Sequence, residues 1–398
     1  MQRIPMLLQK RNVDVRVRLF YWGDLSKGVL YDYLTTANIP FTALHFGETN
    51  QNIRWLLQQI QHSDPDVVIA DNVVPALLCA GWLRDRGIPT VAILRSDDAF
   101  YHGVIECFIH GPKASRVSAA VCVSEYLAEV ITVRQDHGVE VRRIPSGTPI
   151  PVHRKTPDFS IFRAAYVGRL VQEQKRILET VGALTRVCKE VENVEVTIIG
   201  DGPERAEIQR LVSQTGSAVR LAGRLEPLAV QQKLLDSHVV VLLSDYEGTP
   251  TAVMEAMACG VVPVCLQMRS GISELVEHDV TGVIVQDRGD DFVAAIRRLR
   301  NDQALWQRLS AAARQRVSSH FSSDHCADKW AELLLELHRN ATPRKPLRIP
   351  SNLKLPPVHP ALAREDHRSQ KRAWPKDWLT KARKFAGQVR RSLKGDAQ

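Results

Sequence analysis

Short runs of apolar, often β-branched residues alternate along this chain with segments in which apolar residues recur every three or four positions. The first pattern predicts strands that are buried on both faces, and the second predicts helices. The predicted strands lie at 15–22, 41–46, 66–70, 90–95, 119–124, 162–168, 194–200, 219–223, 238–244 and 261–266. Segments with helical spacing lie between them at 74–86, 125–134, 175–190, 203–213 and 287–300.

This alternation predicts an α/β fold of two doubly wound, Rossmann-like domains with parallel sheets. We expect the first domain at 1–150 and the second at 151–320, joined by a segment that holds four prolines between 142 and 160. Residues 321–340 have the pattern of a long amphipathic helix that returns towards the first domain. Residues 341–374 are rich in proline and are expected to form an extended basic linker.

Composition changes this picture little. The 398 residues are 44% hydrophobic and 24% charged, as in ordinary globular proteins. The seven cysteines show no C-x-x-C pair, which predicts buried thiols in a reducing compartment. The sequence has no stretch of about 20 apolar residues, so no membrane span is predicted. The N-terminus lacks the apolar run of a signal peptide. We therefore expect a cytoplasmic protein.

The net charge of +9 is concentrated at one end. Residues 341–398 carry 15 Lys and Arg against 4 Asp and Glu, whereas the preceding 340 residues carry 38 against 40. Within this tail, residues 375–395 place Trp, Phe and Leu on one face of a helical wheel and Lys and Arg on the other. This pattern is typical of a helix that lies on an anionic membrane surface. A disordered tail or a helix bound to a partner protein are the alternatives, and nucleic acid is not the expected partner.

Two glutamates, Glu247 and Glu255, follow the predicted strand 238–244 at a spacing of eight. Thr249 is suited to cap a helix that Gly260 would end. Glu247 would then lie over the carboxyl end of a strand, where open α/β sheets bind ligands. The free amides at the start of that helix favour an anion.

A ligand with hydroxyls for the carboxylates and a phosphate for these amides is a nucleotide sugar. An isolated pair of this kind could instead consist of a solvated loop residue and a residue on a helix surface.

The stretch EGTPTAVMEAMACGVVPV (247–264), followed by SGISELV (270–276) and TGVIV (281–285), resembles the sugar-nucleotide signature of glycosyltransferase family 4 (glycosyl transferases group 1). The resemblance covers about residues 115–340 well and about 15–115 loosely. It implies the two-domain GT-B fold and transfer of a sugar from a nucleotide-sugar donor, UDP- or GDP-linked, with retained configuration. It implies no metal ion and no cofactor.

The resemblance also implies roles for particular residues. Glu247 would contact sugar hydroxyls and Glu255 the ribose, while Glu274 would lie on the sugar side. The loop between the two glutamates would meet the sugar and the phosphate through Gly248, Thr249, Pro250 and Thr251. Ser270 stands where the family has the first of two glycines.

AYVGRLVQEQKR (165–176) places Arg169 and Lys175 six positions apart at the end of a predicted strand. Two cations there can neutralise a diphosphate leaving group, and the resemblance implies that role for this pair. Two exposed basic residues ahead of a helix are the simpler alternative.

GDGP (200–203) resembles a family stretch near the nucleotide, which makes Gly202 a candidate, although a tight turn into a helix accounts for the pattern equally well. LAGRLEP (221–227) resembles the stretch that lines the base, with Gly223 and Arg224 as candidates.

The acceptor side is predicted from the residues that follow strand 90–95. Arg95 stands where many members of the family carry a histidine near the reacting sugar, and Asp97 and Asp98 are candidate acceptor contacts. Helix capping explains either aspartate equally well, and the same holds for Ser124. A D-x-D motif in a metal-binding loop is not found.

The beginning of the chain departs from the family pattern. Members usually open with a strand and a Gly-rich loop near the donor phosphate, whereas residues 1–14 contain no such loop, and Gly23 and Gly28 are poor substitutes. The first strand and its loop are therefore expected to be missing from the first domain of this sequence, either because translation starts further upstream or because the domain has lost them.

The sequence therefore predicts a retaining hexosyltransferase that uses a nucleotide sugar and a glycan or lipid-linked acceptor, with a possible attachment to an anionic membrane. A catalytically inactive GT-B subunit that binds a partner and a sugar-nucleotide epimerase are the alternatives.

Overall fold

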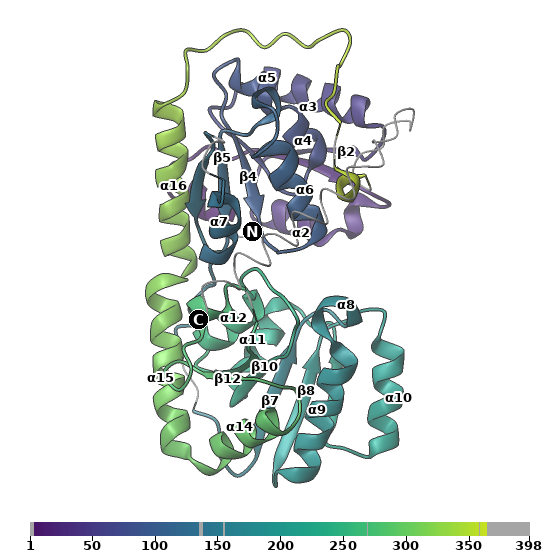
Figure 1. The fold of residues 1–398 in the computed structure, drawn as a ribbon, viewed down its shortest axis with the longest axis vertical. Coiled ribbons are helices and arrows are strands. Elements are labelled where there is room, and N and C mark those ends of the chain that lie inside the picture. Colours follow the sequence, from purple (N-terminus) through teal and green to yellow (C-terminus); the bar gives the residue numbers. More distant parts are fainter. Residues whose placement is uncertain (1–3, 135–137, 154–155, 269, 358, 364–398) are drawn as a thin grey trace.

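The computed structural model describes residues 4–134, 138–153, 156–268, 270–357 and 359–363. Two α/β domains lie one above the other, and the long helices α15 (Gln303–His320) and α16 (Ser323–Arg339) run along one side of both (Figure 1). The N-terminal domain is built from the strands β1 to β6, and the C-terminal domain from β7 to β12. The predicted helix 375–395 lies outside the described residues.

The C-terminal domain contains one parallel sheet of six strands in the order β12-β11-β10-β7-β8-β9. Counted along the chain from its first strand, this is the Rossmann order, and the direction of winding reverses between β7 and β10. Its strands are β7 (Phe162–Val167), β8 (Val194–Ile199), β9 (Val219–Gly223), β10 (Val239–Leu242), β11 (Val262–Leu266) and β12 (Val283–Val285).

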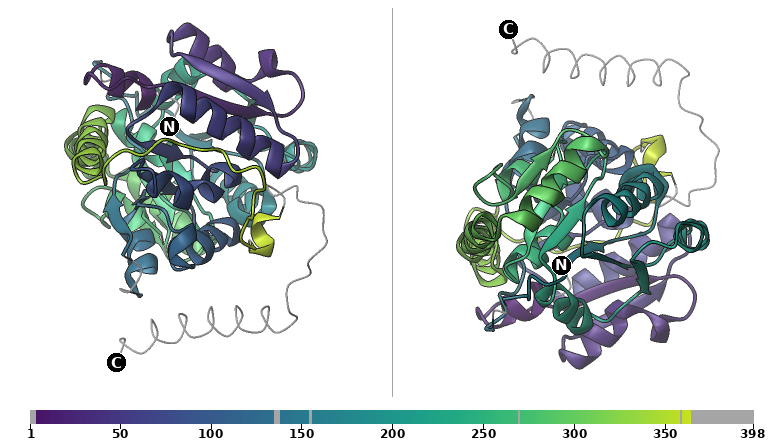
Figure 2. Two further views of the ribbon diagram at one scale, coloured as in Figure 1. Left: turned by 90° about the horizontal axis from the view of Figure 1, so that it is seen from above. Right: turned by 90° about the horizontal axis from the view of Figure 1, so that it is seen from below.

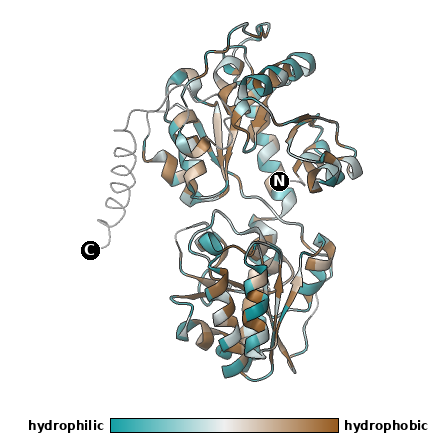
Figure 3. Cartoon of the chain, turned by 90° about the vertical axis from the view of Figure 1, so that its right-hand side faces the viewer, coloured by the Kyte–Doolittle hydropathy of each residue, from teal (hydrophilic) through white to brown (hydrophobic). Residues whose placement is uncertain are grey.

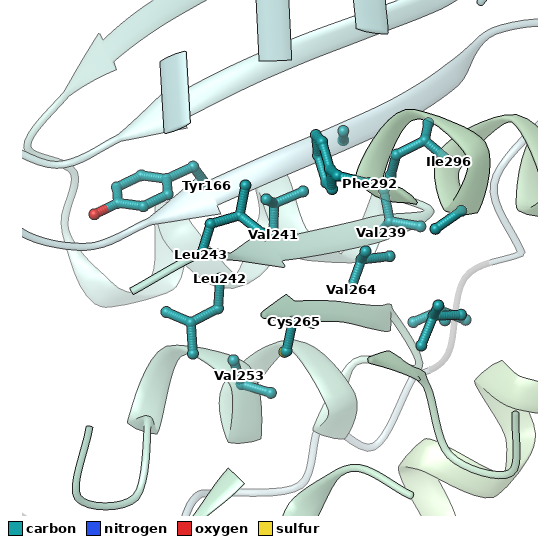
Figure 4. Close-up of a cluster of buried hydrophobic side chains, with 14 of the residues drawn as sticks. Tyr166, Val239, Val241, Leu242, Leu243, Val253, Val264, Cys265, Phe292 and Ile296 are labelled. Carbon is teal, nitrogen blue, oxygen red and sulfur yellow. The ribbon is translucent and has the colours of Figure 1, made fainter. Parts of the chain in front are cut away.

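Helices cover both faces of this sheet, as the near-continuous apolar character of its strands requires. They are α8 (Gln172–Lys175), α9 (Ile177–Glu190), α10 (Arg205–Thr215), α11 (Pro227–Leu235), α12 (Thr251–Ala258), α13 (Ile272–Leu275), α14 (Asp290–Asn301) and α15. The strands are the hydrophobic interior of the domain, and the outer helices show hydrophilic residues towards solvent (Figure 3). Val241, Val264 and Phe292 meet in this core, with Tyr166 at its edge (Figure 4).

The N-terminal domain contains two separate parallel sheets. A two-stranded sheet pairs β1 (Val17–Tyr21) with β2 (Phe41–His45), and a four-stranded sheet has the order β3-β4-β5-β6. The strands of the larger sheet are β3 (Val68–Ala70), β4 (Thr90–Leu94), β5 (Ala119–Cys122) and β6 (Glu140–Arg143). Within the described residues no strand joins β1 to β3, although in the C-terminal sheet β7 occupies the corresponding place between β8 and β10.

Alternate residues of β4 and β5 face two different cores. Val91, Ile93, Ala119 and Val121 pack against α16 and α1 (Ile4–Gln9). Ala92, Leu94, Ala120 and Cys122 face the opposite way, because side chains alternate along a strand. The helices on that side and around the small sheet are α2 (Val29–Thr36), α3 (Thr49–Ser63), α4 (Val74–Leu78), α5 (Ala80–Arg84), α6 (Ala99–Phe108) and α7 (Glu125–Thr132).

The chain passes between the domains twice, and the two passages lie side by side. Thr148 donates its N–H to the carbonyl of Phe321 at 2.9 Å, and Ser323 donates to the carbonyl of Thr148 at 2.8 Å. From there α16 packs on the N-terminal domain through Trp330 and Leu333. Within the described residues, these two hydrogen bonds are the only backbone pairing between the two passages. We call this place the crossover.

After α16 the chain is extended, as its prolines predict, but it is not free of the body. Residues 341–357 and 359–362, which we call the strap, run across the outer end of the N-terminal domain to a short 3₁₀ turn at Pro360–Leu362 (Figure 2). Arg54 donates to the carbonyls of Pro350 and Ser351 at 3.0 and 2.5 Å, and Leu362 is fully buried against α6. The strap is therefore part of the N-terminal core.

The sequence pattern missed some elements. The strand β6 has the sequence EVRR, which carries no apolar run, and it forms because its backbone pairs with β5. The helices α3 and α15 were not predicted either, although both have the apolar spacing of a helix packed on one face.

Candidate active site

A cavity of about 570 Å³ lies between the two domains, at the carboxyl ends of the C-terminal strands. Val167 and Gly168 at the end of β7 and Leu242 at the end of β10 line it, so it stands where the winding of the sheet reverses. Open α/β sheets bind ligands at this point, because the loops from the two strands diverge there and leave a crevice. Residues of the N-terminal domain close the opposite side.

Four polar side chains form a connected network on the C-terminal wall of the cavity. Lys175 Nζ lies 2.5 Å from Glu247 Oε1, and the two side chains are 13% and 8% exposed. Gln174 donates to Glu247 Oε2 at 3.3 Å and accepts a hydrogen bond from Arg169 at 2.9 Å. Arg169, Lys175 and Glu247, which the sequence analysis placed at one site, are thus neighbours across two loops.

Tyr166 supports this wall from beneath. Its ring is buried in the C-terminal core, and its hydroxyl donates to the carbonyl of Arg169 at 3.0 Å (Figure 4). Burial raises the pKa of the Tyr166 hydroxyl, so this group stays a neutral donor. This hydrogen bond therefore connects the loop that carries Arg169 to the core of the domain.

The loop from Gly248 to Thr251 forms the second part of this wall and touches the other domain. A Cβ atom on Gly248 would lie 1.8 Å from the carbonyl oxygen of Arg95, so only glycine fits between the two backbones. Helix α12 begins at Thr251 with Pro250 at its N-cap, which corrects the expectation that Thr249 caps it. The hydroxyl of Thr249 donates instead to the carbonyl of Val123 in the N-terminal domain at 2.6 Å.

The N-terminal wall carries charge as well. Arg95 Nη2 lies 2.6 Å from Asp71 Oδ1, and both residues follow strands of the four-stranded sheet. Asp98 caps α6 by accepting from the N–H groups of Phe100 and Tyr101. The hydroxyl of Tyr101 donates to Asn72 at 2.8 Å, and burial raises the pKa of Tyr101 to about 12. Arg95, Asp98 and Asn72 all line the cavity.

Other residues that the sequence singled out are not in the lining of this cavity. Asp97 accepts from Tyr126 at 2.7 Å and lies 2.8 Å from His102, and this hydrogen bond raises the pKa of His102. Glu274 is bound to residues of the N-terminal domain, and Glu255 is half-buried on α12. Ser124 caps α7. The remaining residues outside the lining are Gly202, Gly223 and Arg224.

Gln174, Asn72 and Tyr101 are among the lining residues that were not predicted. Asn72 had a usable signal, because it belongs to an Asp-Asn pair directly after an apolar strand and adopts a positive φ of 56°. Gln174 had none, since a glutamine beside a lysine on a short helix is not distinctive.

The described part of the chain contains no metal-binding group of side chains, no disulfide and no helix that could cross a membrane. No group of three or more His, Cys, Asp or Glu side chains there is arranged to hold a metal ion. All seven cysteines have free thiols. No helix among the described residues is long and apolar enough to cross a membrane.

Comparison with known families gives one match. Residues 161–316 match the model of the family described as "Glycosyl transferases group 1". The matched region contains Arg169, Lys175 and Glu247, which form the C-terminal wall of the cavity.

Curated relatives carry out sugar transfer. The chain is 32% identical over 152 residues to the lipopolysaccharide core biosynthesis glycosyltransferase LpsD of Rhizobium meliloti, a match that covers 38% of this chain and 44% of LpsD. It is 29% identical over 309 residues to glycogen synthase of Mycobacterium tuberculosis, and this match covers 72% of each protein. These similarities support an enzyme of the glycosyltransferase class.

Solved structures show the fold. The structure of Anabaena Alr3699/HepE in complex with UDP and glucose superposes with a TM-score of 0.67 at 19% identity, covering 84% of this chain and 95% of that one. Sucrose-phosphate synthase from Thermosynechococcus elongatus gives a TM-score of 0.62 at 18% identity, covering 81% and 99%. The fold is GT-B, with two Rossmann-like domains facing each other across a cleft, as the sequence predicted.

Proposed function

We propose that this protein is a retaining glycosyltransferase of the family 4 type, which moves a hexosyl group from a nucleotide sugar to a hydroxyl of a glycan or glycolipid. The observation that carries the proposal is the gathering of Arg169, Lys175 and Glu247 around one cavity, beside the start of α12 and opposite Arg95. In such a transfer the bond from the anomeric carbon to the phosphate oxygen breaks and the nucleoside diphosphate leaves. The acceptor oxygen forms the new bond to the anomeric carbon, and its proton passes to the phosphate oxygen of the departing nucleoside diphosphate.

On the donor side, Arg169 and Lys175 are proposed to bind the diphosphate. Two cations beside the backbone amides of Gly248 and Thr251 stabilise the negative charge that develops as the leaving group departs. Glu247 accepts hydrogen bonds from sugar hydroxyls, and its contact with Lys175 lets one lysine bridge the sugar site and the phosphate site. Glu255 is assigned to the ribose.

On the acceptor side, Arg95 and Asp98 stand across the cavity from Glu247 and are proposed to bind the acceptor hydroxyls. The ion pair of Arg95 with Asp71 favours this position of the guanidinium by electrostatic attraction. Asp97 supports this wall through His102 and Tyr126.

The donor is proposed to be a UDP-sugar, because the HepE and TarM structures that share this fold contain UDP. One relative transfers GalNAc to an undecaprenol-linked glycan, and a lipid-linked acceptor would suit attachment to the inner face of a membrane through residues 375–395. Sedimentation with anionic and with neutral vesicles tests this attachment, and equal binding to both would contradict it.

The decisive experiment is a thermal-shift series with UDP, GDP and ADP on the wild type, Arg169→Ala and Glu255→Ala. A ligand that binds only the folded state raises the melting temperature. We expect a shift with UDP that both variants lose. Turnover of UDP-hexoses with a glycan acceptor, with the anomeric configuration of the product read by NMR, then tests transfer and retention. Absence of a shift with every nucleotide would contradict the donor site.

A further inference from the structure

The carboxylate of Glu274 crosses from one domain to the other. Glu274 lies on α13 of the C-terminal domain, and its Oε1 accepts the backbone N–H of Glu125 at 2.6 Å. Its Oε2 accepts from Arg143 Nε at 2.8 Å and lies 2.5 Å from Arg143 Nη2. Glu125 begins α7 and Arg143 ends β6, both in the N-terminal domain. The side chains of Glu274 and Arg143 are 17% and 23% exposed, so bulk water screens this contact only in part.

Arg143 is also held at the crossover. Its guanidinium carbon lies 5.2 Å from the ring centroid of Phe321, which is a favourable distance for a cation–π contact. Phe321 joins α15 to α16, and its carbonyl accepts from Thr148 of the other passage. Arg143 therefore lies beside the place where the two passages between the domains run together.

Glu274 is linked to the donor loop by a short path. Gly271, the N-cap of α13, donates its N–H to the carbonyl of Gly248 at 2.7 Å. The next residue of that loop, Thr249, bonds to Val123, which directly precedes the N-cap of α7. Two parts of the C-terminal domain, Glu274 and Thr249, thus form hydrogen bonds with the start of α7 and the residue before its N-cap. Of these two residues, Thr249 lines the cavity.

Elementary electrostatics explains why this contact is favourable. The first amides of a helix have no partner within the helix and carry partial positive charge, so a carboxylate at the start of α7 is stabilised there. A carboxylate that receives two donors from one arginine makes charge-assisted bonds stronger than neutral ones. Because the partners belong to different domains, all of these bonds require the two domains to be closed on each other.

We propose that Glu274, Arg143 and the N-terminus of α7 form an interdomain latch that holds the domains closed with the loop 248–251 in place. Glu274 is then a positioning residue, which acts through the domain angle instead of contacting the sugar. The proposal deepens the proposed function, on which its kinetic part rests. Its conformational part does not depend on any substrate.

The test uses four variants of the latch. They are Glu274→Gln, Arg143→Gln, the double variant Glu274→Gln/Arg143→Gln, and the charge exchange Glu274→Arg/Arg143→Glu. The radius of gyration from small-angle X-ray scattering reports the opening of the domains. Affinity for UDP and kcat/KM for a UDP-hexose report the donor site and the reaction. Arg142→Gln is the matched control, because Arg142 on the same strand pairs with Glu140 and Glu336, away from the C-terminal domain.

The latch predicts a larger radius of gyration for both single variants, about a tenfold loss of kcat/KM, and weaker UDP affinity, because the loop 248–251 that it holds contributes backbone amides to the diphosphate site. The double variant should be no worse than either single variant, and the charge exchange should recover part of the loss. The control should match the wild type in every measurement.

A different result would overturn the latch. If Glu274→Gln lowers kcat/KM while Arg143→Gln does not, Glu274 contacts the sugar directly. An unchanged radius of gyration in both single variants also contradicts the proposal. A wild type that binds no nucleotide would refute the proposed function alone, since the scattering comparison is made on the protein without substrate.

Discussion

Lys175 and Glu247 form a largely buried ion pair in the wall of the cavity, with 2.5 Å between Nζ and Oε1. The two residues are 72 positions apart, on the short helix α8 and in the loop after β10. Their pairing joins the two strands between which the winding of the sheet reverses. It also places a cation and an anion within reach of one ligand.

Breaking this pair should cost both stability and activity. Glu247→Gln leaves Lys175 charged and without its partner, which is expected to lower the free energy of unfolding by about 3 kcal/mol. The double variant Lys175→Met/Glu247→Gln should recover most of that stability but no sugar transfer. Urea unfolding and turnover of the UDP-hexose measure the two effects. A double variant as unstable as the single one would show that the charge left behind is not the cause.

Gly248 should tolerate no side chain. A Cβ atom there meets the Arg95 carbonyl at 1.8 Å, so Gly248→Ala must push the two domains apart or displace the loop. We expect at least about a hundredfold loss of kcat/KM, because a misplacement of about 1 Å can cost that much. Gly182→Ala in α9 is the control, since a Cβ atom there meets nothing within 4 Å. It should leave kcat/KM unchanged and raise stability by about 0.5–1 kcal/mol.

His238 should make stability depend on pH. It is fully buried between Phe162 and Trp306, and burial lowers its pKa from 6.5 to about 4. The unfolded chain therefore binds a proton in a range where the folded protein does not, and stability falls as the pH drops from about 6.5 to about 4. The full effect is on the order of 3 kcal/mol.

The variant His238→Asn isolates this contribution, because its amide oxygen can accept the N–H of Arg163 as the imidazole does. The variant should be less stable at pH 7, and its melting temperature should approach that of the wild type as the pH is lowered. A constant difference between pH 7 and pH 4.5 would rule out His238 as the titrating group.

The strap should behave as part of the core. Leu362 is fully buried against α6, so Leu362→Ala is expected to destabilise the protein by about 2–3 kcal/mol. Leu228→Ala on α11 is the matched control, because that side chain is 77% exposed, and it should change stability by less than about 0.5 kcal/mol. Equal melting temperatures for the two variants would show that the strap is a loosely attached linker.

Much of the fold followed from hydrophobic pattern alone. All ten predicted strands form, because a parallel strand buried on both faces must be a short apolar run, and such runs are easy to see. β6 was missed because its pairing with β5, and not its side chains, makes it a strand. Helix α3 also has a regular apolar spacing, which buries Ile53, Leu56, Leu57 and Ile60 on one face.

The candidate site was predictable where chemistry depends on local spacing. Arg169 with Lys175, and Glu247 with the loop behind it, follow strand ends, and strand ends of a parallel sheet share one edge. Thr249 illustrates the limit of local reasoning. Its position suggested a helix cap, but its hydroxyl bonds to the carbonyl of Val123 in the other domain.

The sequence by itself determined most of the strands, the two-domain class and the residues that gather at the ends of β7 and β10, because these depend on periodicity and on spacing within short segments. Only the tertiary structure decided what lies across the cleft: the fit of Gly248 against Arg95, the position of Asn72, and the contact of Glu274 with Arg143 and α7. Such relationships join residues more than a hundred positions apart. They depend on how two independently packed cores dock, and no pattern of near neighbours encodes that.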